Sequence, residues 1–132
     1  MNIIIAYLAT LIPLGILDGI WVLLIAKGFY AEHMGFLFTK SVNLVPVVFF
    51  YPIYAFGVLL LAVLPAVNSA SWVEALWRGA LLGLLAYGAY DLTNHATIAN
   101  WPLVMTIVDM AWGMTVTALT SVLAYFLITI IK

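Results

Sequence analysis

The sequence predicts an all-α integral membrane protein that forms a bundle of four transmembrane helices. Of its 132 residues, 67% are hydrophobic and only 7% are charged. The mean hydropathy is +1.24, and a soluble domain of this length cannot bury so much apolar surface, so the lipid bilayer must solvate it. Polar groups of a backbone inside a bilayer have to be hydrogen-bonded within the protein, and this requirement predicts helices.

Four segments reach the length of about 20 mainly apolar residues that one membrane crossing needs. Lys27 follows the first segment, and Pro65 follows the second. Pro102 begins the fourth, because proline is favoured in the first turn of a helix. We therefore expect one transmembrane domain over residues 1–132, with spans at about residues 3–26, 44–64, 73–94 and 102–131.

Composition and charge exclude several classes of function and leave the membrane orientation open. The absence of cysteine excludes disulfides and thiolate metal sites. The net charge of −1, without a basic run, gives no support for nucleic-acid binding. No basic residue precedes the first apolar segment, so we interpret it as a retained helix and not as a signal peptide. The positive-inside count is tied, with Arg78 and Lys132 on one side and Lys27 and Lys40 on the other.

Three aspartates, Asp18, Asp91 and Asp109, lie inside predicted spans. A carboxylate in hydrocarbon is costly, so such residues face the interior of a bundle, find partners or bind a ligand. A helix rises about 1.5 Å per residue, which places Asp18 roughly 13 Å from Lys27 and Asp109 roughly 12 Å from Trp101. Asp91 is only about 6 Å from its own helix end by the same measure. All three therefore belong to the half of the membrane next to the 27–43 and 95–101 connections, and we expect one polar pocket there.

Other polar and aromatic residues accompany the aspartates on the predicted helix faces. Asp18-Gly-Ile-Trp21 and Asp109-Met-Ala-Trp112 repeat the same step on helices that cross in opposite directions, as in an inverted repeat, although two matching positions also arise by chance. No catalytic motif is present. The predicted solute-binding or ion-binding residues are Asp18, Asp91, Asp109, Asn94, His95, Tyr87, Tyr51, Asn43, Trp21 and Trp112.

Several sequence elements together resemble a small family of bacterial membrane proteins. They are Asp18-Gly-Ile-Trp21, Phe29-Tyr30, Phe50-Tyr51-Pro-Ile-Tyr54, Tyr87-Gly-Ala-Tyr90-Asp91-Leu-Thr93-Asn94, Trp101-Pro102 and Asp109-Met-Ala-Trp112-Gly113. The family that they resemble is catalogued as a domain of unknown function with four predicted spans. The resemblance covers nearly the whole chain and implies a multi-pass protein of the bacterial inner membrane, but it implies no activity.

Three functions fit this sequence. The first is transport of a small solute, cation or proton, in which the aspartates bind the cargo and at least one exchanges a proton. The second is an enzyme embedded in the membrane that acts on a lipid or isoprenoid through paired carboxylates. The third is a structural or assembly subunit.

Four spans enclose little space, so we also expect a homo-oligomer. We predict no cofactor; the acidic residues with His95 would suit a divalent metal, but no recognised metal motif is present.

Overall fold

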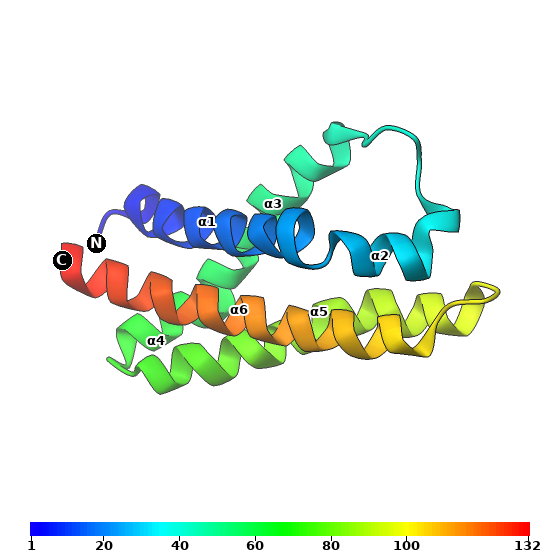
Figure 1. Ribbon diagram of the computed structural model, residues 1–132. Coiled ribbons are helices and arrows are strands. Elements are labelled where there is room, and N and C mark those ends of the chain that lie inside the picture. Colours follow the sequence, from blue (N-terminus) through cyan, green and yellow to red (C-terminus); the bar gives the residue numbers. More distant parts are fainter.

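The computed structural model describes all residues from 1 to 132, and the protein is entirely helical (Figure 1). Two helices continue into π-helical turns, which wind the backbone more loosely than an α-helix does. The elements are α1 (Ile3–Ile20) with the π-helical turn Trp21–Ile25, α2 (Lys27–Met34) with the 3₁₀ turn Gly35–Leu37, α3 (Leu44–Val58) with the π-helical turn Leu59–Val63, α4 (Leu64–Asn68), α5 (Trp72–Thr97) and α6 (Leu103–Ile131).

Three of these helical segments are long and apolar enough to cross a membrane, namely Ile3–Ile25, Leu44–Asn68 and Leu103–Ile131. The protein is therefore an all-helical protein with three candidate spans. The second segment extends to Asn68, four residues beyond the predicted end, because Pro65 falls in the first turn of α4, where proline removes no needed hydrogen bond. Helix α5 is long as well, but it carries Glu74, Arg78 and Asp91.

Helices α1, α5 and α6 run side by side, whereas α3 runs obliquely to them, and the two termini lie at the same end of the molecule (Figure 1). Helix α6 contacts both α1 and α5 along its length. The connection through α2 and the short loop between α5 and α6 both lie at the opposite end. Helix α3 packs on α1, but its first residues, 44–50, are all exposed. The bundle is therefore closed at the end with the termini and more open at the other end.

The closed end has a dry apolar core. Small and branched side chains from every long helix meet there and pack closely against one another. The core residues are Ala6, Ala9, Val58, Leu59, Val63, Ala66, Val67, Ala75, Ala124, Tyr125 and Ile128.

Helices α5 and α6 approach each other closely through glycines. A Cβ atom added to Gly79 would lie 2.7 Å from the Thr117 carbonyl oxygen, and one added to Gly83 would overlap the Gly113 carbonyl. Only glycine permits this approach of two backbones, as in other membrane helix pairs. This seam of close backbone contacts fixes the register of α5 against α6.

Candidate functional site

Asp18 joins three helices at the open end of the bundle. Its side chain extends from α1 and is only 6% exposed. The Nε1 atom of Trp112 on α6 donates to Asp18 Oδ1 at 2.8 Å, and the hydroxyl of Tyr51 on α3 donates to Oδ2. Both carboxylate oxygens therefore have a donor, which is the arrangement that suits an ionised, acceptor-only group.

The two tryptophans of the repeated Asp-x-x-Trp step stack on each other. The rings of Trp21 and Trp112 are 4.4 Å apart between centroids and 9° from parallel. Trp21 begins the π-helical turn, and its Nε1 donates to the Tyr30 hydroxyl at 2.8 Å. That hydroxyl donates in turn to Asp109 Oδ1 at 2.8 Å. Asp18 thus accepts directly from Trp112, whereas Asp109 is linked to Trp21 through the Tyr30 hydroxyl.

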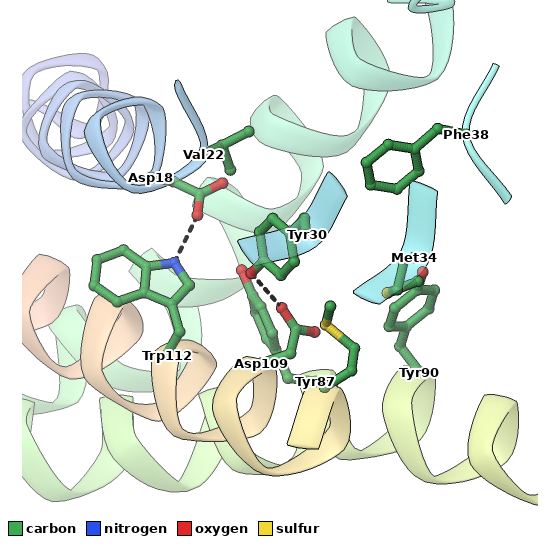
Figure 2. A pocket seen from close by; sticks show the side chains of 10 residues that line it. Asp18, Val22, Tyr30, Met34, Phe38, Tyr87, Tyr90, Asp109 and Trp112 are labelled. Carbon is green, nitrogen blue, oxygen red and sulfur yellow. Dashed lines mark hydrogen bonds between the residues drawn. The ribbon is translucent and has the colours of Figure 1, made fainter. Parts of the chain in front are cut away.

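A cavity of about 230 Å³ lies between these groups (Figure 2). Asp18 and Asp109 both line it, so the structure brings two of the three aspartates into one pocket, as the sequence predicts. No lysine, arginine or histidine lines the cavity, and its other walls are aromatic or aliphatic. The lining residues are Asp18, Val22, Tyr30, Met34, Phe38, Tyr87, Tyr90, Met105, Asp109 and Trp112.

A second cavity, of about 280 Å³, lies between α3 and α5 and reaches Asp109 from the other side. Tyr87, Tyr90 and Asp109 line both cavities. The remaining walls of the second cavity are apolar or aromatic, from Phe50, Tyr54 and Ala86. Tyr54 is anchored there by a hydrogen bond of 2.7 Å between its hydroxyl and Thr117 Oγ1.

Asp91 lies beside the cavities and lines neither of them. Its side chain is completely buried in α5, and neither carboxylate oxygen has a hydrogen-bond partner. None of the three aspartates forms an ion pair with a lysine or with the arginine, because the single ion pair of the protein joins Arg78 to Glu74. Asp91 is therefore the one acid of the three whose environment offers no donor at all.

The remaining predicted residues are not part of the cavity walls. The Nδ1 atom of His95 lies 3.1 Å from Thr106 Oγ1, which also accepts from Trp101 Nε1 at 3.0 Å. Asn94 is partly exposed and lines neither cavity. Asn43 is exposed and caps α3, with its side chain accepting from the Val45 backbone N–H. The sequence placed Asn43, Asn94 and His95 near the pocket, whereas the structure assigns capping and helix-end contacts to Asn43 and His95.

The sequence interpretation missed the contribution of α2. The 27–43 connection was read as a link between spans, but Tyr30, Met34 and Phe38 from this segment line the first cavity. Tyr30 and Met34 are four residues apart and share one face of α2, and this pair is the signal that the sequence offers. Phe38 follows the helix in extended backbone. Met105 and Tyr90 were missed as well, since neither their type nor their position distinguishes them from packing residues.

Tyr30 keeps its proton under ordinary conditions. Burial raises the pKa of its hydroxyl well above the usual range, and the charge of Asp109 acts in the same direction, against the donated bond from Trp21. The hydroxyl thus stays a donor to Asp109 at any physiological pH. No three His, Cys, Asp or Glu side chains come close enough together to hold one metal ion.

Residues 3–126 match the model of a family described as a predicted membrane protein, DUF2177. The chain belongs to this family. No curated protein and no solved structure matches the sequence. The DUF2177 match, together with three apolar helices, identifies an integral membrane protein that sits in a lipid bilayer. The function of this DUF2177 member has to be argued from its own cavity.

Proposed function

We propose that this DUF2177 protein is a transporter that binds a small organic cation between Asp18 and Asp109. The observation that carries the proposal is the composition of the first cavity. Two carboxylates line it, no cationic side chain does, and the other eight residues are aromatic or aliphatic. A ligand with a positive charge would therefore suit this cavity.

The aromatic walls favour an organic ammonium group over a metal ion. Five of the lining residues are aromatic: Tyr30, Phe38, Tyr87, Tyr90 and Trp112. Aromatic faces attract ammonium groups by about 0.5–2 kcal/mol each, depending on how far the site excludes water. A hard metal ion would instead need six or more oxygen ligands or a compact set of carboxylates, and no such set is present.

We propose further that α5 is the fourth span, so that the protein forms a four-helix bundle. Its 26 residues extend over about 39 Å, more than the roughly 30 Å of bilayer hydrocarbon. It runs beside α6 over its whole length (Figure 1), Asp91 faces inward, and Arg78 and Glu74 neutralise each other near one end. A location in the bacterial inner membrane and a homo-oligomeric state belong to this proposal.

The dry core at the closed end determines the kind of transport. It fills the bundle at that end with apolar side chains, which favours a carrier over an open channel. Cargo would cross only if the helices rearranged to open the other end, as in alternating access. The two π-helical turns, at 21–25 and 59–63, interrupt the regular α-helical winding of α1 and α3, and such turns are frequent at functional sites.

Calorimetric titration of the purified protein with choline tests the binding site. The neutral isostere 3,3-dimethyl-1-butanol is the matched control, because it has the same shape without the charge. We expect choline to bind and the alcohol not to bind, and we expect Asp109→Asn to lower choline affinity at least tenfold. Glu74→Gln, outside the cavity, should leave it unchanged. Equal behaviour of the two ligands would refute a cation site.

Proteoliposomes test the transport step. Labelled choline should accumulate when a pH gradient is imposed, and Asp109→Asn should abolish the uptake. Binding without uptake in either direction would refute transport, even though the cation site would stand.

One observation favours an enzyme as a second candidate. The second cavity brings an apolar wall of Phe50, Tyr54 and Ala86 up to Asp109. A lipid could place its chain along that wall and its head group at the carboxylate. Incubation with bacterial membrane lipids, followed by mass spectrometry, would show a product that depends on Asp109 if this alternative is correct.

A further inference from the structure

The packing of α5 against α6 determines which residue faces Asp91. These helices are antiparallel, and Tyr87 of α5 rests directly on Gly113 of α6, where an added Cβ would overlap the tyrosine ring. Asp91 follows Tyr87 by one helical turn, and Asp109 precedes Gly113 by one turn. In an antiparallel pair, moving one turn along both helices leads to the next facing positions. Asp91 and Asp109 therefore face each other across the seam.

The hydrogen bonds around these two carboxyl groups leave one oxygen of Asp109 and both oxygens of Asp91 without a partner. Asp109 Oδ1 accepts from Tyr30, while its Oδ2 has no donor. Asp91 is completely buried and has no partner on either oxygen. A buried carboxylate without any hydrogen bond is strongly disfavoured, and two carboxylates side by side also repel each other.

The surrounding groups supply no positive charge in place of a proton. Asp109 is the charged group that acts on Asp91. On α5 itself, Tyr90 carries no positive charge, and the His95 ring makes its hydrogen bond with Thr106. From α2, the Tyr30 hydroxyl is already committed to Asp109 Oδ1. The lysines and the arginine of the chain form no ion pair with either acid.

We infer that Asp91 and Asp109 together bind one proton. The proton resides on Asp91, whose carboxylic O–H donates to Asp109 Oδ2. A single proton thus gives Asp91 its missing partner, fills the free oxygen of Asp109 and reduces the charge of the pair from −2 to −1.

This proton site gives the proposed cation site its coupling, and this step rests on the proposed function. When a cation binds at Asp109, its positive charge replaces that of the proton. Asp91 then releases the proton to solvent, and the cation beside Asp109 compensates the charge of the ionised Asp91–Asp109 pair. The Asp91–Asp109 pair carries −1 with its proton before the exchange. Afterwards the two ionised carboxylates and the monovalent cation again sum to −1, and the charge of Asp18 does not change. One proton leaves for each cation that enters.

Infrared spectroscopy of the protein without ligand tests the proton site independently of any cargo. A protonated carboxyl group gives a C=O stretch that is resolved from amide and carboxylate bands. We expect such a band near pH 7, and we expect it to shift when aspartate is labelled with ¹³C at its side-chain carboxyl group. Asp91→Asn should remove the band, whereas the matched variant Asp18→Asn should keep it. A wild-type spectrum without an aspartate C=O band would overturn the inference, whether or not any variant folds.

Proton release on addition of choline tests the coupling. With a pH indicator in weakly buffered detergent solution, wild type should release about one proton per choline bound, as the charge balance above requires. Asp91→Asn should bind choline and release none. Choline binding without proton release in the wild type would overturn the coupling. Failure of choline to bind would refute the proposed cation site, while the infrared band would still decide on the proton site.

Discussion

The two ends of this helix bundle are built on different principles. At the end with the termini, small and branched apolar side chains pack into one core. At the opposite end, aromatic rings hold the helices apart around two cavities, and all three aspartates lie there. The first arrangement gives stability, since it buries apolar side chains in close contact with one another. The second keeps space and charge that a structural bundle would not need.

The comparison also separates two kinds of aspartate. Asp18 has a donor on each oxygen and ties α1 to α3 and α6, so its role includes holding the structure together. Asp91 has no donor and contributes nothing to stability in its ionised form. A buried acid that costs stability is usually retained because it has a function. The difference therefore teaches that the acids of one pocket need not share one role.

The largest effect is expected from truncating the closed core. Leu59 is completely buried there, and Leu59→Ala should lower the free energy of unfolding by about 2–5 kcal/mol because it leaves a cavity. Phe38 lines the open cavity but is 53% exposed, so Phe38→Ala should cost much less. Unfolding in mixed micelles by increasing SDS measures both. Similar losses for the two variants would mean that the two ends do not differ as described.

The second prediction contrasts the two kinds of aspartate. Asp18→Asn removes hydrogen bonds to a charged group and should lower stability by about 1.5–3 kcal/mol. Asp91→Asn supplies an amide donor for Asp109 Oδ2 and removes a buried acid, so the variant should melt at or above the wild-type temperature. Thermal melting in detergent near pH 7 compares the two. A melting temperature for Asp91→Asn as low as that for Asp18→Asn would show that both acids are structural.

The third prediction concerns the seam that joins the two ends. Gly83→Ala places a methyl group against the backbone of Gly113, which cannot move aside as a flexible side chain can. We expect a loss of about 1–3 kcal/mol in stability and a change in the position of Tyr87. Gly57→Ala is the control, because an added Cβ there meets nothing within 4 Å. If Gly83→Ala were as stable as Gly57→Ala, the register used to pair Asp91 with Asp109 would be wrong.

The sequence predicted most of the fold because hydropathy alone determines where apolar helices lie. The starts of the helices at Ile3, Leu44 and Leu103 agree with the predicted spans to within one residue. The end of the second span at Asn68 was missed, since a π-helical turn before Pro65 carries the helix past the proline. The choice between three and four membrane crossings depends on α5, whose charged residues lower its mean hydropathy.

The sequence predicted the site less completely than the fold. Depth along the helices was enough to bring Asp18 and Asp109 together, and the repeated Asp-x-x-Trp step corresponds to a real stack of two tryptophans. Tyr30 was missed because it reaches Asp109 from a segment between the spans, 79 residues away in the chain. The isolation of Asp91 was also missed, since the absence of donors around a side chain depends on the packing of several helices at once.

The smallest expected effect tests the relay through Tyr30. Tyr30→Phe removes the hydroxyl that joins Trp21 to Asp109, and we expect a loss of about 0.5–1.5 kcal/mol in stability. Tyr125→Phe is the matched control at the closed end, where the tyrosine is buried among apolar side chains and its hydroxyl forms no hydrogen bond with another residue.

Because burial keeps the Tyr30 pKa above its usual range, its folded-state pKa exceeds the unfolded value. The stability it contributes is thus fully present below the unfolded pKa of about 10 and falls only as the pH rises above it. The difference between the two variants, measured by thermal melting from about pH 6 to 9, should therefore be constant. A difference that changed within that range would assign the titration to another group at the open end, with Asp91 and Asp109 the first pair to examine.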